Sequence, residues 1–321
     1  MEIAPGIHRI GCTFGDRVVY VHLITGGERV VLVDTGLAFS PEQDIFPYMQ
    51  KLGLTPAALD LVFITHSDSD HQGGNDVIRR AAPRAQFACH LLDAPWIENA
   101  QALINERYGQ FERRDGIGPD AAVKAAIARE CASSTPMDWH LQGGERYRIG
   151  AGRTVRFVHT PGHTWGHTAV LDESSRTLIA GEAALHTAIL GLNGQPALPP
   201  TYAYIASYQA TLERLLGMDL AVYSPAHWPV QRGNDIRTFL SESLKYCRET
   251  EQKLLALLRA APAPLTLQAI ITALNDELGD WPKSMAGELA HGLGGHLNWL
   301  VSRGLVAESE AGGRRVFAAV R

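Results

Sequence analysis

The sequence contains the stretch Thr65-His66-Ser67-Asp68-Ser69-Asp70-His71-Gln72-Gly73-Gly74 directly after the apolar run Leu61-Val62-Phe63-Ile64. Imidazole and carboxylate groups are ligands that borderline divalent cations favour. Because a turn after a strand can direct several side chains into one cavity, the stretch predicts a metal site at a strand end. The two glycines supply backbone freedom where the chain leaves this crowded pocket.

Strand-like and helix-like patterns alternate on both sides of this stretch. Strands are expected over residues 18–25, 29–34, 61–65, 145–149, 154–159, 168–172, 177–180 and 220–223. Helices are expected after Ser40-Pro41, over residues 75–82 and over residues 203–216. Residues 93–132 are mostly helical and interrupt the strand pattern, so they are expected to form a lid or a substrate-facing insertion.

Three predicted strands of the second half also lead into potential metal ligands. These are His163 in Pro161-Gly162-His163-Thr164, Glu182 directly after Gly181, and His227 after Pro225-Ala226. A single histidine after a strand is more often a hydrogen-bonded structural residue than a ligand. The ordered set, taken together with residues 65–74, is far more specific than any of its parts.

The order of these motifs resembles that of the metallo-β-lactamase superfamily. The usual pattern is H-x-H-x-D-H, a histidine in P-G-H-T, an acidic residue after a glycine at a strand end, and a final histidine. The resemblance spans roughly residues 6–231 and includes Asp34-Thr35-Gly36. It implies an α/β (α+β) fold, a four-layer αββα sandwich with the site at one edge of the sheets, and a metal-dependent hydrolase.

The resemblance also implies a ligand set for two divalent metal ions. The implied ligands are His66, Asp68, Asp70, His71, His163, Glu182 and His227. The first metal would be held by His66 and His163, and the second by Asp70, His71 and His227. Zinc is the first expectation for both ions, with iron or manganese as alternatives.

Two of these positions depart from the usual pattern. Asp68 stands where most members have a second histidine, and Glu182 stands where a bridging aspartate is expected. Each change keeps a ligand atom but alters its reach and hardness. A carboxylate in place of a neutral imidazole adds a negative charge, which shifts the expected preference from zinc toward harder cations.

Several alternatives remain open at this stage. Asp68 could point away and leave a single-metal site, Glu182 could accept a hydrogen bond behind the ligands instead of bridging, and His186 could replace a ligand. Asp34 is expected to accept a hydrogen bond from a ligand imidazole and so to fix its tautomer. His159 and His167 are likewise expected behind the ligands or in the packing around them.

The ligand set implies hydrolysis by a metal-bound hydroxide, with Asp70 as the catalytic residue that orients it and passes on its proton. The substrate pocket is expected to include Trp165, Tyr202, Tyr204 and Trp228. These aromatic side chains favour a small, apolar or aromatic ester, thioester, lactone or lactam.

Two other functions compete with hydrolysis. The carboxylate at Asp68 is similar to the pattern of flavodiiron proteins, so a non-haem diiron oxidoreductase is the second hypothesis, although no flavodoxin-like phosphate loop follows His227. The third hypothesis is a regulatory protein that keeps the fold to bind a ligand or DNA.

Residues 233–321 are expected to form a second, smaller domain behind a catalytic domain of residues 1–232. A long helix over residues 234–260, two further helices and a hairpin resemble a winged helix. The helix expected to recognise DNA, residues 287–300, contains no lysine or arginine, so nucleic acid is not an expected partner. We expect this domain to cover the active site or to form a homodimer contact.

The composition is that of an ordinary folded enzyme. The chain has 321 residues, of which 45% are hydrophobic, and a formal net charge of −5, so no general attraction to nucleic acid or anionic membranes is expected. No stretch approaches a membrane span and residues 1–6 carry no leader pattern, which makes a cytoplasmic location the expectation. The four cysteines form no C-x-x-C pair and are expected to be buried thiols.

Overall fold

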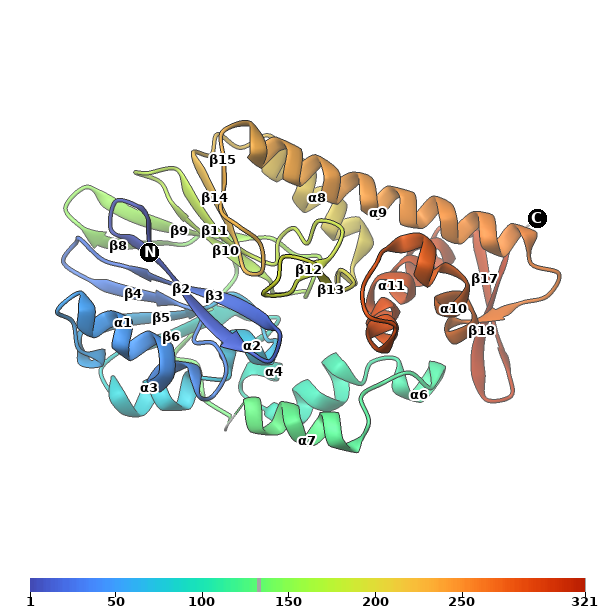
Figure 1. Ribbon diagram of the computed structural model, residues 1–321, viewed down its shortest axis with the longest axis horizontal. Helices are drawn as coiled ribbons and strands as arrows, with labels where there is room; N and C mark the ends of the chain where they lie inside the picture. Colours follow the sequence, from blue (N-terminus) through green and yellow to red (C-terminus); the bar gives the residue numbers. More distant parts are fainter. Residues whose placement is uncertain (132–133, 321) are drawn as a thin grey trace.

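Two β-sheets stacked face to face form the left part of the molecule in Figure 1, a computed structural model that describes residues 1–131 and 134–320. The ends of the expected insertion at residue 132 and of the expected second domain at residue 321 lie outside these ranges. The first sheet has the order β1 (Glu2–Ala4), β2 (Ile7–Phe14), β3 (Arg17–Ile24), β4 (Val30–Val33), β5 (Leu59–Ile64), β6 (Gln86–His90) and β7 (Trp139–Leu141). Strands β1 to β4 pair antiparallel, and β4 to β7 pair parallel.

The second sheet has the order β15 (Gln231–Arg232), β14 (Val222–Pro225), β11 (Thr177–Gly181), β10 (Thr168–Asp172), β9 (Arg153–His159) and β8 (Arg146–Gly150). The two sheets share an apolar core, in which the rings of Phe63 and Phe157 stack at 4.4 Å. Strand β5 is apolar along almost its whole length because one of its faces meets the other sheet and the other meets helices.

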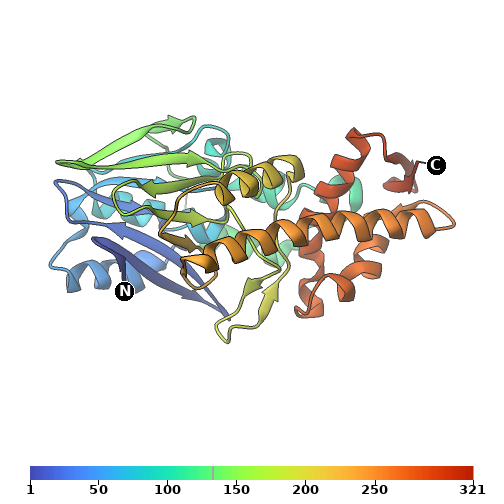
Figure 2. The ribbon, with the colours of Figure 1, turned by 90° about the horizontal axis from the view of Figure 1, so that it is seen from above.

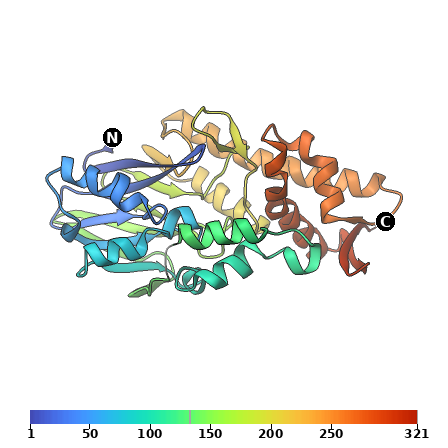
Figure 3. The ribbon, with the colours of Figure 1, turned by 60° about the horizontal axis from the view of Figure 1, so that its bottom comes forward.

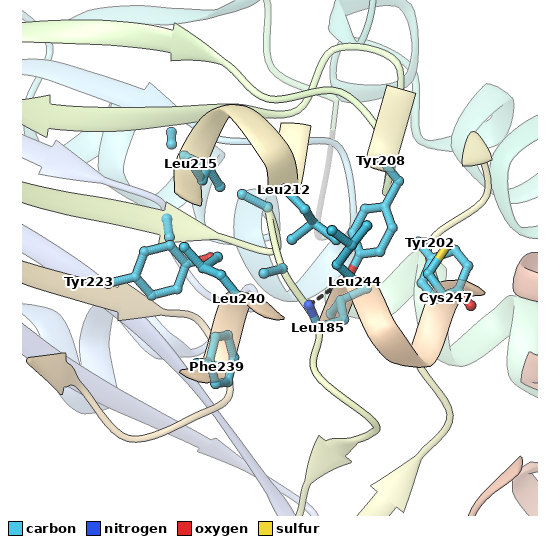
Figure 4. Close-up of a cluster of buried hydrophobic side chains, with 14 of the residues drawn as sticks. Leu185, Tyr202, Tyr208, Leu212, Leu215, Tyr223, Phe239, Leu240, Leu244 and Cys247 are labelled. Carbon is cyan, nitrogen blue, oxygen red and sulfur yellow. Dashed lines mark hydrogen bonds between the residues drawn. The ribbon is translucent and has the colours of Figure 1, made fainter. Parts of the chain in front are cut away.

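Helices cover the outer face of each sheet. The first sheet packs against α1 (Phe46–Lys51) and α3 (Asn75–Ala81), and the second against α8 (Ile205–Leu216) and the first half of α9 (Asn234–Ala260). On α8, Tyr208, Leu212 and Leu215 share one face and pack with Leu240 of α9 (Figure 4). The four-layer αββα sandwich is therefore confirmed.

The segment between β6 and β7 is helical, as the sequence predicts. This insertion, defined here as residues 93–131, contains α4 (Ala94–Ile97), α5 (Ala100–Ala102), η3 (Leu103–Tyr108), α6 (Glu112–Asp115) and α7 (Ala121–Glu130). Figure 3 shows these green helices reaching from the sheets to the red C-terminal elements. Smaller elements are η1 (Pro41–Ile45), η2 (Pro56–Ala58), α2 (Ser69–Gln72), β12 (Ile189–Leu190) and β13 (Pro196–Leu198).

The C-terminal part has a separate apolar core. It contains β16 (Leu265–Thr266), α10 (Leu267–Leu278), η4 (Lys283–Glu288), α11 (Leu289–Ser302), β17 (Val306–Ala311) and β18 (Arg314–Ala319). Helix, helix and hairpin follow one another as expected, and the resemblance to a winged helix stays a prediction. Among the described residues, no helix is both long and apolar enough to cross a bilayer.

Helix α9 belongs to both cores. Leu240 and Leu244 in its first half pack on the second sheet, whereas Leu254 and Leu258 in its second half pack with α10 and α11. Figure 2 shows this orange helix running along the molecule from the sheets to the C-terminal elements. The expected domain division at residues 232 and 233 thus falls just before a helix that serves both parts.

Candidate metal centre

The implied ligands converge at one edge of the stacked sheets. His66, Asp68, Asp70 and His71 lie in the loop and short helix that follow β5, and His163, Glu182 and His227 follow β9, β11 and β14. They form two adjacent groups whose ligand atoms lie within 4.8 Å of one another inside each group. Motifs that are far apart in the sequence therefore form one cluster, because the four strands that precede them end at the same edge.

The first group consists of His66, Asp68, His163 and Glu182, all of them buried. Glu182 Oε2 lies 2.8 Å from His66 Nε2 and 2.9 Å from His163 Nε2. Asp68 Oδ2 lies 2.9 Å from His163 Nε2 and 3.9 Å from His66 Nε2. Asp68 thus faces the group, which does not support the alternative that it points away.

The second group consists of Asp70, His71 and His227. Asp70 Oδ2 lies 3.8 Å from His71 Nε2 and 3.4 Å from His227 Nε2. Glu182 reaches this group as well, with Oε2 at 3.8 Å from His71 Nε2 and Oε1 at 3.6 Å from His227 Nε2. Glu182 therefore lies between the two groups, where a bridging ligand would have to lie.

Each of the four imidazoles is held from outside through its Nδ1 atom. The partners are Asp34 Oδ2 for His71 at 2.8 Å, the carbonyl oxygen of Thr201 for His163 at 3.1 Å, the carbonyl oxygen of Val18 for His227 at 2.9 Å, and Thr65 Oγ1 for His66 at 3.1 Å. These acceptors fix the proton on Nδ1 and direct the Nε2 lone pairs toward the centre. Asp34 lies where the sequence places it, behind a ligand imidazole.

The donor set fits divalent cations. Within the described residues, His66 Nε2, His71 Nε2 and Asp68 Oδ1 are buried and make no hydrogen bond of acceptable geometry, which is costly unless another group satisfies them. Burial opposes ionisation of Asp68, but the charges of Arg107 and His163 hold its pKa far below the usual range. Burial would lower the pKa of His71, but neighbouring carboxylates, led by Asp70, raise it to about 10. Negative charge is thus concentrated where cations would neutralise it.

Arg107 is a residue of this centre that the sequence does not reveal. Its buried guanidinium, from η3 of the insertion, donates from Nη2 to Asp68 Oδ2 at 3.2 Å. Nη2 also lies 3.4 Å from His163 Nε2. The insertion contains several arginines, and no motif distinguishes one from another. The feature of the sequence that points to a cation at this centre is the extra negative charge of Asp68. Together, Asp68 and Arg107 carry no net charge, like the neutral imidazole that they replace.

The other histidines lie outside the two ligand groups. The ring of His186 packs tilted against that of Trp228, with 4.3 Å between centroids, and pairs with Glu242 at 2.5 Å, so it does not replace a ligand. His159 is bound to the carbonyl oxygen of Trp165 and stacks on another histidine. His167 is also outside the groups and lies behind Glu182, where its Nε2 atom accepts a hydrogen bond from the backbone N–H of Glu182 at 2.9 Å.

A cavity of about 560 Å³ opens above the ligands Asp68, Asp70, Glu182 and His227. The insertion contributes one wall, which includes Phe111, Ile117, Val123 and Ile127, and the C-terminal part contributes another, which includes Met285, Glu288 and His291. Phe14 and Arg17 of the hairpin formed by β2 and β3, with Ile189 and Leu198, complete the lining. The insertion therefore forms one wall of the cavity above the candidate ligands, and its role toward a substrate stays a prediction.

The four aromatic residues expected in the pocket do not belong to this lining within the described chain. Tyr202 is buried and stacks on Tyr208 at 4.5 Å, inside the core between α8 and α9 (Figure 4). Trp165 stacks on Tyr204 at 4.0 Å, and Trp228 packs against Phe239. Trp165 and Trp228 lie close to candidate ligands in the sequence, but all four aromatic side chains pack against the core or the loops.

The chain belongs to the metallo-beta-lactamase superfamily, whose family model matches residues 14–227. It is therefore an enzyme of the metallo-β-lactamase fold, as the order of the motifs implies. Its structure superimposes on that of a metallo-beta-lactamase family protein from Thermus thermophilus with a TM-score of 0.77, at 22% identity, over 99% of this chain and 100% of that one.

Curated relatives include three proteins of similar sequence. The beta-lactamase-like protein 2 homolog of Drosophila melanogaster is 25% identical over 297 residues, which cover 90% of this chain and 84% of that protein. The uncharacterized protein YobT of Bacillus subtilis is 27% identical over 177 residues, which cover 55% of this chain and 66% of YobT. A putative diflavin flavoprotein from a Nostoc species is 23% identical over 180 residues, which cover 52% of this chain but 25% of that protein.

Proposed function

We propose that the protein is a metal-dependent hydrolase of a small, apolar or aromatic ester, thioester, lactone or lactam. The observation that carries this proposal is the pair of adjacent ligand groups at the floor of a cavity of about 560 Å³. Four imidazoles present Nε2 lone pairs there, together with the carboxylates of Asp68, Asp70 and Glu182. This arrangement suits two divalent cations better than one.

Divalent cations bound at such a site lower the pKa of water and polarise a carbonyl oxygen. The residues of the chain would position the attacking water and transfer its proton. The side chain of Asp70 is 18% exposed and lies at the cavity floor, so it is the carboxylate best placed to orient an attacking water and carry a proton to the leaving group. The apolar walls would exclude bulk water and hold the acyl or aryl part of the substrate.

The charges of the cavity wall narrow the substrate class. Besides the ligands, the described lining has three carboxylates, Asp120, Glu130 and Glu288, and one guanidinium, that of Arg17, which lies 3.5 Å from Asp16. This excess of negative charge disfavours polyanionic substrates. We therefore rank uncharged esters, lactones and short acyl thioesters ahead of substrates that carry phosphate groups. For the same reason, we do not propose nucleic acid as a partner.

Metal analysis combined with a substrate panel tests this proposal. We expect about two equivalents of divalent metal per chain, loss of hydrolysis after chelation, and its recovery when a single type of metal is added back. Esters, lactones, thioesters and β-lactams would be assayed with the purified full-length protein. Unchanged hydrolysis by protein from which the metal has been removed would contradict the proposal.

Replacing Asp68 with histidine should restore the usual ligand pattern but destabilise the protein. The substitution leaves the buried guanidinium of Arg107 without its carboxylate, and an unpaired buried charge costs about 3–5 kcal/mol. The double variant D68H/R107M removes that charge and should recover most of the loss. Denaturant unfolding of the metal-free proteins measures both effects.

The matched control for this pair is Asp76→His, which alters a carboxylate on α3 that is 28% exposed and pairs with Arg80. It should change stability by at most about 0.5 kcal/mol. If D68H were as stable as this control, the ion pair with Arg107 would not compensate the charge of Asp68. In the double variant we also expect a higher zinc occupancy of the first group, because imidazole is a softer ligand than carboxylate.

A non-haem diiron oxidoreductase is the second candidate. It is favoured by the carboxylate-rich ligand set and by the match to the diflavin flavoprotein from Nostoc. Against it, the charge of Arg107 offsets the extra carboxylate that motivated iron. Elemental analysis and an optical spectrum of protein purified without added metal distinguish the two, since full hydrolytic activity in iron-free protein excludes the oxidative function.

A further inference from the structure

We infer that the C-terminal part is a component of the metal centre, through His291 on α11 as a positioning residue for Arg107 and Asp68. This inference rests on the proposed metal-dependent function. It assigns a role to three residues that lie far apart in the sequence and meet in a chain of hydrogen bonds. The chain runs from His291 to Arg107 and from Arg107 to Asp68.

The guanidinium of Arg107 connects the two ends of this chain. Its Nη1 atom donates to His291 Nδ1 at 2.9 Å, and its Nη2 atom donates to Asp68 Oδ2 at 3.2 Å. Gln110 Nε2 donates to the same Nδ1 atom at 2.8 Å. Because a guanidinium is planar and rigid, fixing one of its nitrogens also fixes the direction of the other. His291 thereby sets the position from which Arg107 holds Asp68.

His291 has the protonation state that this role requires. Two donors point at Nδ1, so Nδ1 must be the unprotonated nitrogen of a neutral ring. Burial, followed by the nearby charge of Arg107, lowers the pKa of His291 well below its ordinary value. The other nitrogen, Nε2, lies 3.7 Å from Glu288 Oε2, which gives its hydrogen an acidic neighbour.

The segment that carries His291 is anchored independently of the metal ligands. Helix α11 packs on α9 and α10 through Leu293, Leu297 and Leu300, and Phe111 of the insertion packs in the same core. The ring of Phe111 also meets the ring of His291 edge to face, at 5.8 Å between centroids. The C-terminal part can therefore hold a fixed acceptor over Arg107 while the sandwich supplies the ligand.

Truncating His291 should weaken one metal site and leave the other intact. Without the acceptor, Arg107 is free to rotate and Asp68 loses its fixed orientation in the first group. The second group contains no residue of this chain of hydrogen bonds. Removal of a residue that orients a metal ligand typically weakens metal binding by about 10–100-fold. We therefore expect the variant to bind one equivalent of metal tightly and the other more weakly.

The test compares cobalt(II) binding by the full-length protein and three variants, followed by visible absorption and by metal content after dialysis. For His291→Ala we expect one of two equivalents to bind about 10–100-fold more weakly. His291→Asn retains an acceptor oxygen near the position of Nδ1 and should bind both equivalents with affinities within about threefold of the original protein.

His296→Ala is the matched control. His296 is also a buried histidine of α11, but it contacts Tyr202 and Glu251 instead of the metal centre. This variant should bind both equivalents normally. Thermal unfolding of all variants shows whether each is folded, and His291→Asn keeps the test informative if the alanine variant is not.

Four results would overturn the inference. If His291→Ala bound both equivalents as tightly as the original protein, His291 would not position the ligand, and the proposed hydrolase would still stand. If His296→Ala weakened the same equivalent equally, or if His291→Asn behaved like the alanine variant, the effect would belong to the packing of α11. If the original protein bound no cobalt, the proposed metal-dependent function would be contradicted, and the inference with it.

Discussion

Replacing Asp70 with asparagine is expected to reduce kcat/KM for the best substrate by about 10²–10⁴-fold, which is the usual contribution of a positioned proton-transfer group. The substitution preserves the size of the side chain. It removes the carboxylate that lies 3.4 Å from His227 Nε2 and 3.8 Å from His71 Nε2 at the cavity floor. An amide is a weaker metal ligand and cannot carry the proton to the leaving group.

Steady-state kinetics with the substrate found in the panel measures this effect, and metal content must be determined in parallel. The control is Asp76→Asn, which alters a partly exposed carboxylate that pairs with Arg80 on the same helix, and which should leave the kinetics unchanged. An Asp70→Asn variant that kept full kcat/KM with both metals bound would exclude a catalytic role for Asp70. A variant that lost one metal and its activity together would identify Asp70 mainly as a ligand.

Replacing Asp115 with alanine is expected to lower the free energy of unfolding by about 3 kcal/mol, at the lower end of the range for a broken buried ion pair. Asp115 on α6 accepts hydrogen bonds from Arg315 Nε at 2.9 Å and Nη2 at 2.6 Å. Their side chains are 0% and 8% exposed. Asn298 and Glu308 also contact Arg315, so its charge is not left wholly unpaired, which limits the loss.

Urea unfolding monitored by circular dichroism and by tryptophan fluorescence measures this loss, and the two probes show whether the C-terminal part unfolds separately. The matched control is Asp219→Ala, which breaks an exposed pair with Arg176 and should cost at most about 1 kcal/mol. If both variants lost the same stability, the contact between α6 and β18 would not hold the insertion in place.

The sequence predicts the strands of the sandwich correctly where their local residue pattern matches the environment that they have in the folded protein. Strand β5 is apolar and ends in ligands, so both its existence and its role follow from its residues. Strand β2 is not predicted, because His8 and Arg9 interrupt its apolar pattern. Both are nevertheless buried: the guanidinium of Arg9 lies 3.3 Å from the ring centroid of Tyr20 and donates to the carbonyl oxygen of Pro225 at 2.9 Å. Only the folded neighbours explain why a charged residue is tolerated there.

The candidate ligands are predictable for the same reason, since each follows a strand that ends at one edge. The residues around them are not. Arg107 and His291 are 184 positions apart, and no local pattern marks their contact with each other or with Asp68. The cavity walls are likewise built largely by the insertion and the C-terminal part, whereas the four aromatic residues expected in the pocket pack against the core and the loops.

The construction of α9 has a consequence for how a substrate enters. This helix spans residues 234–260, about 40 Å at the rise of an α-helix, and it is packed along both halves without an internal glycine or proline. A swinging motion of the C-terminal part would have to break the helix or strip one of its faces from an apolar core. We therefore expect no hinge opening during turnover, so that substrate exchange depends on local loop movements at the rim of the cavity.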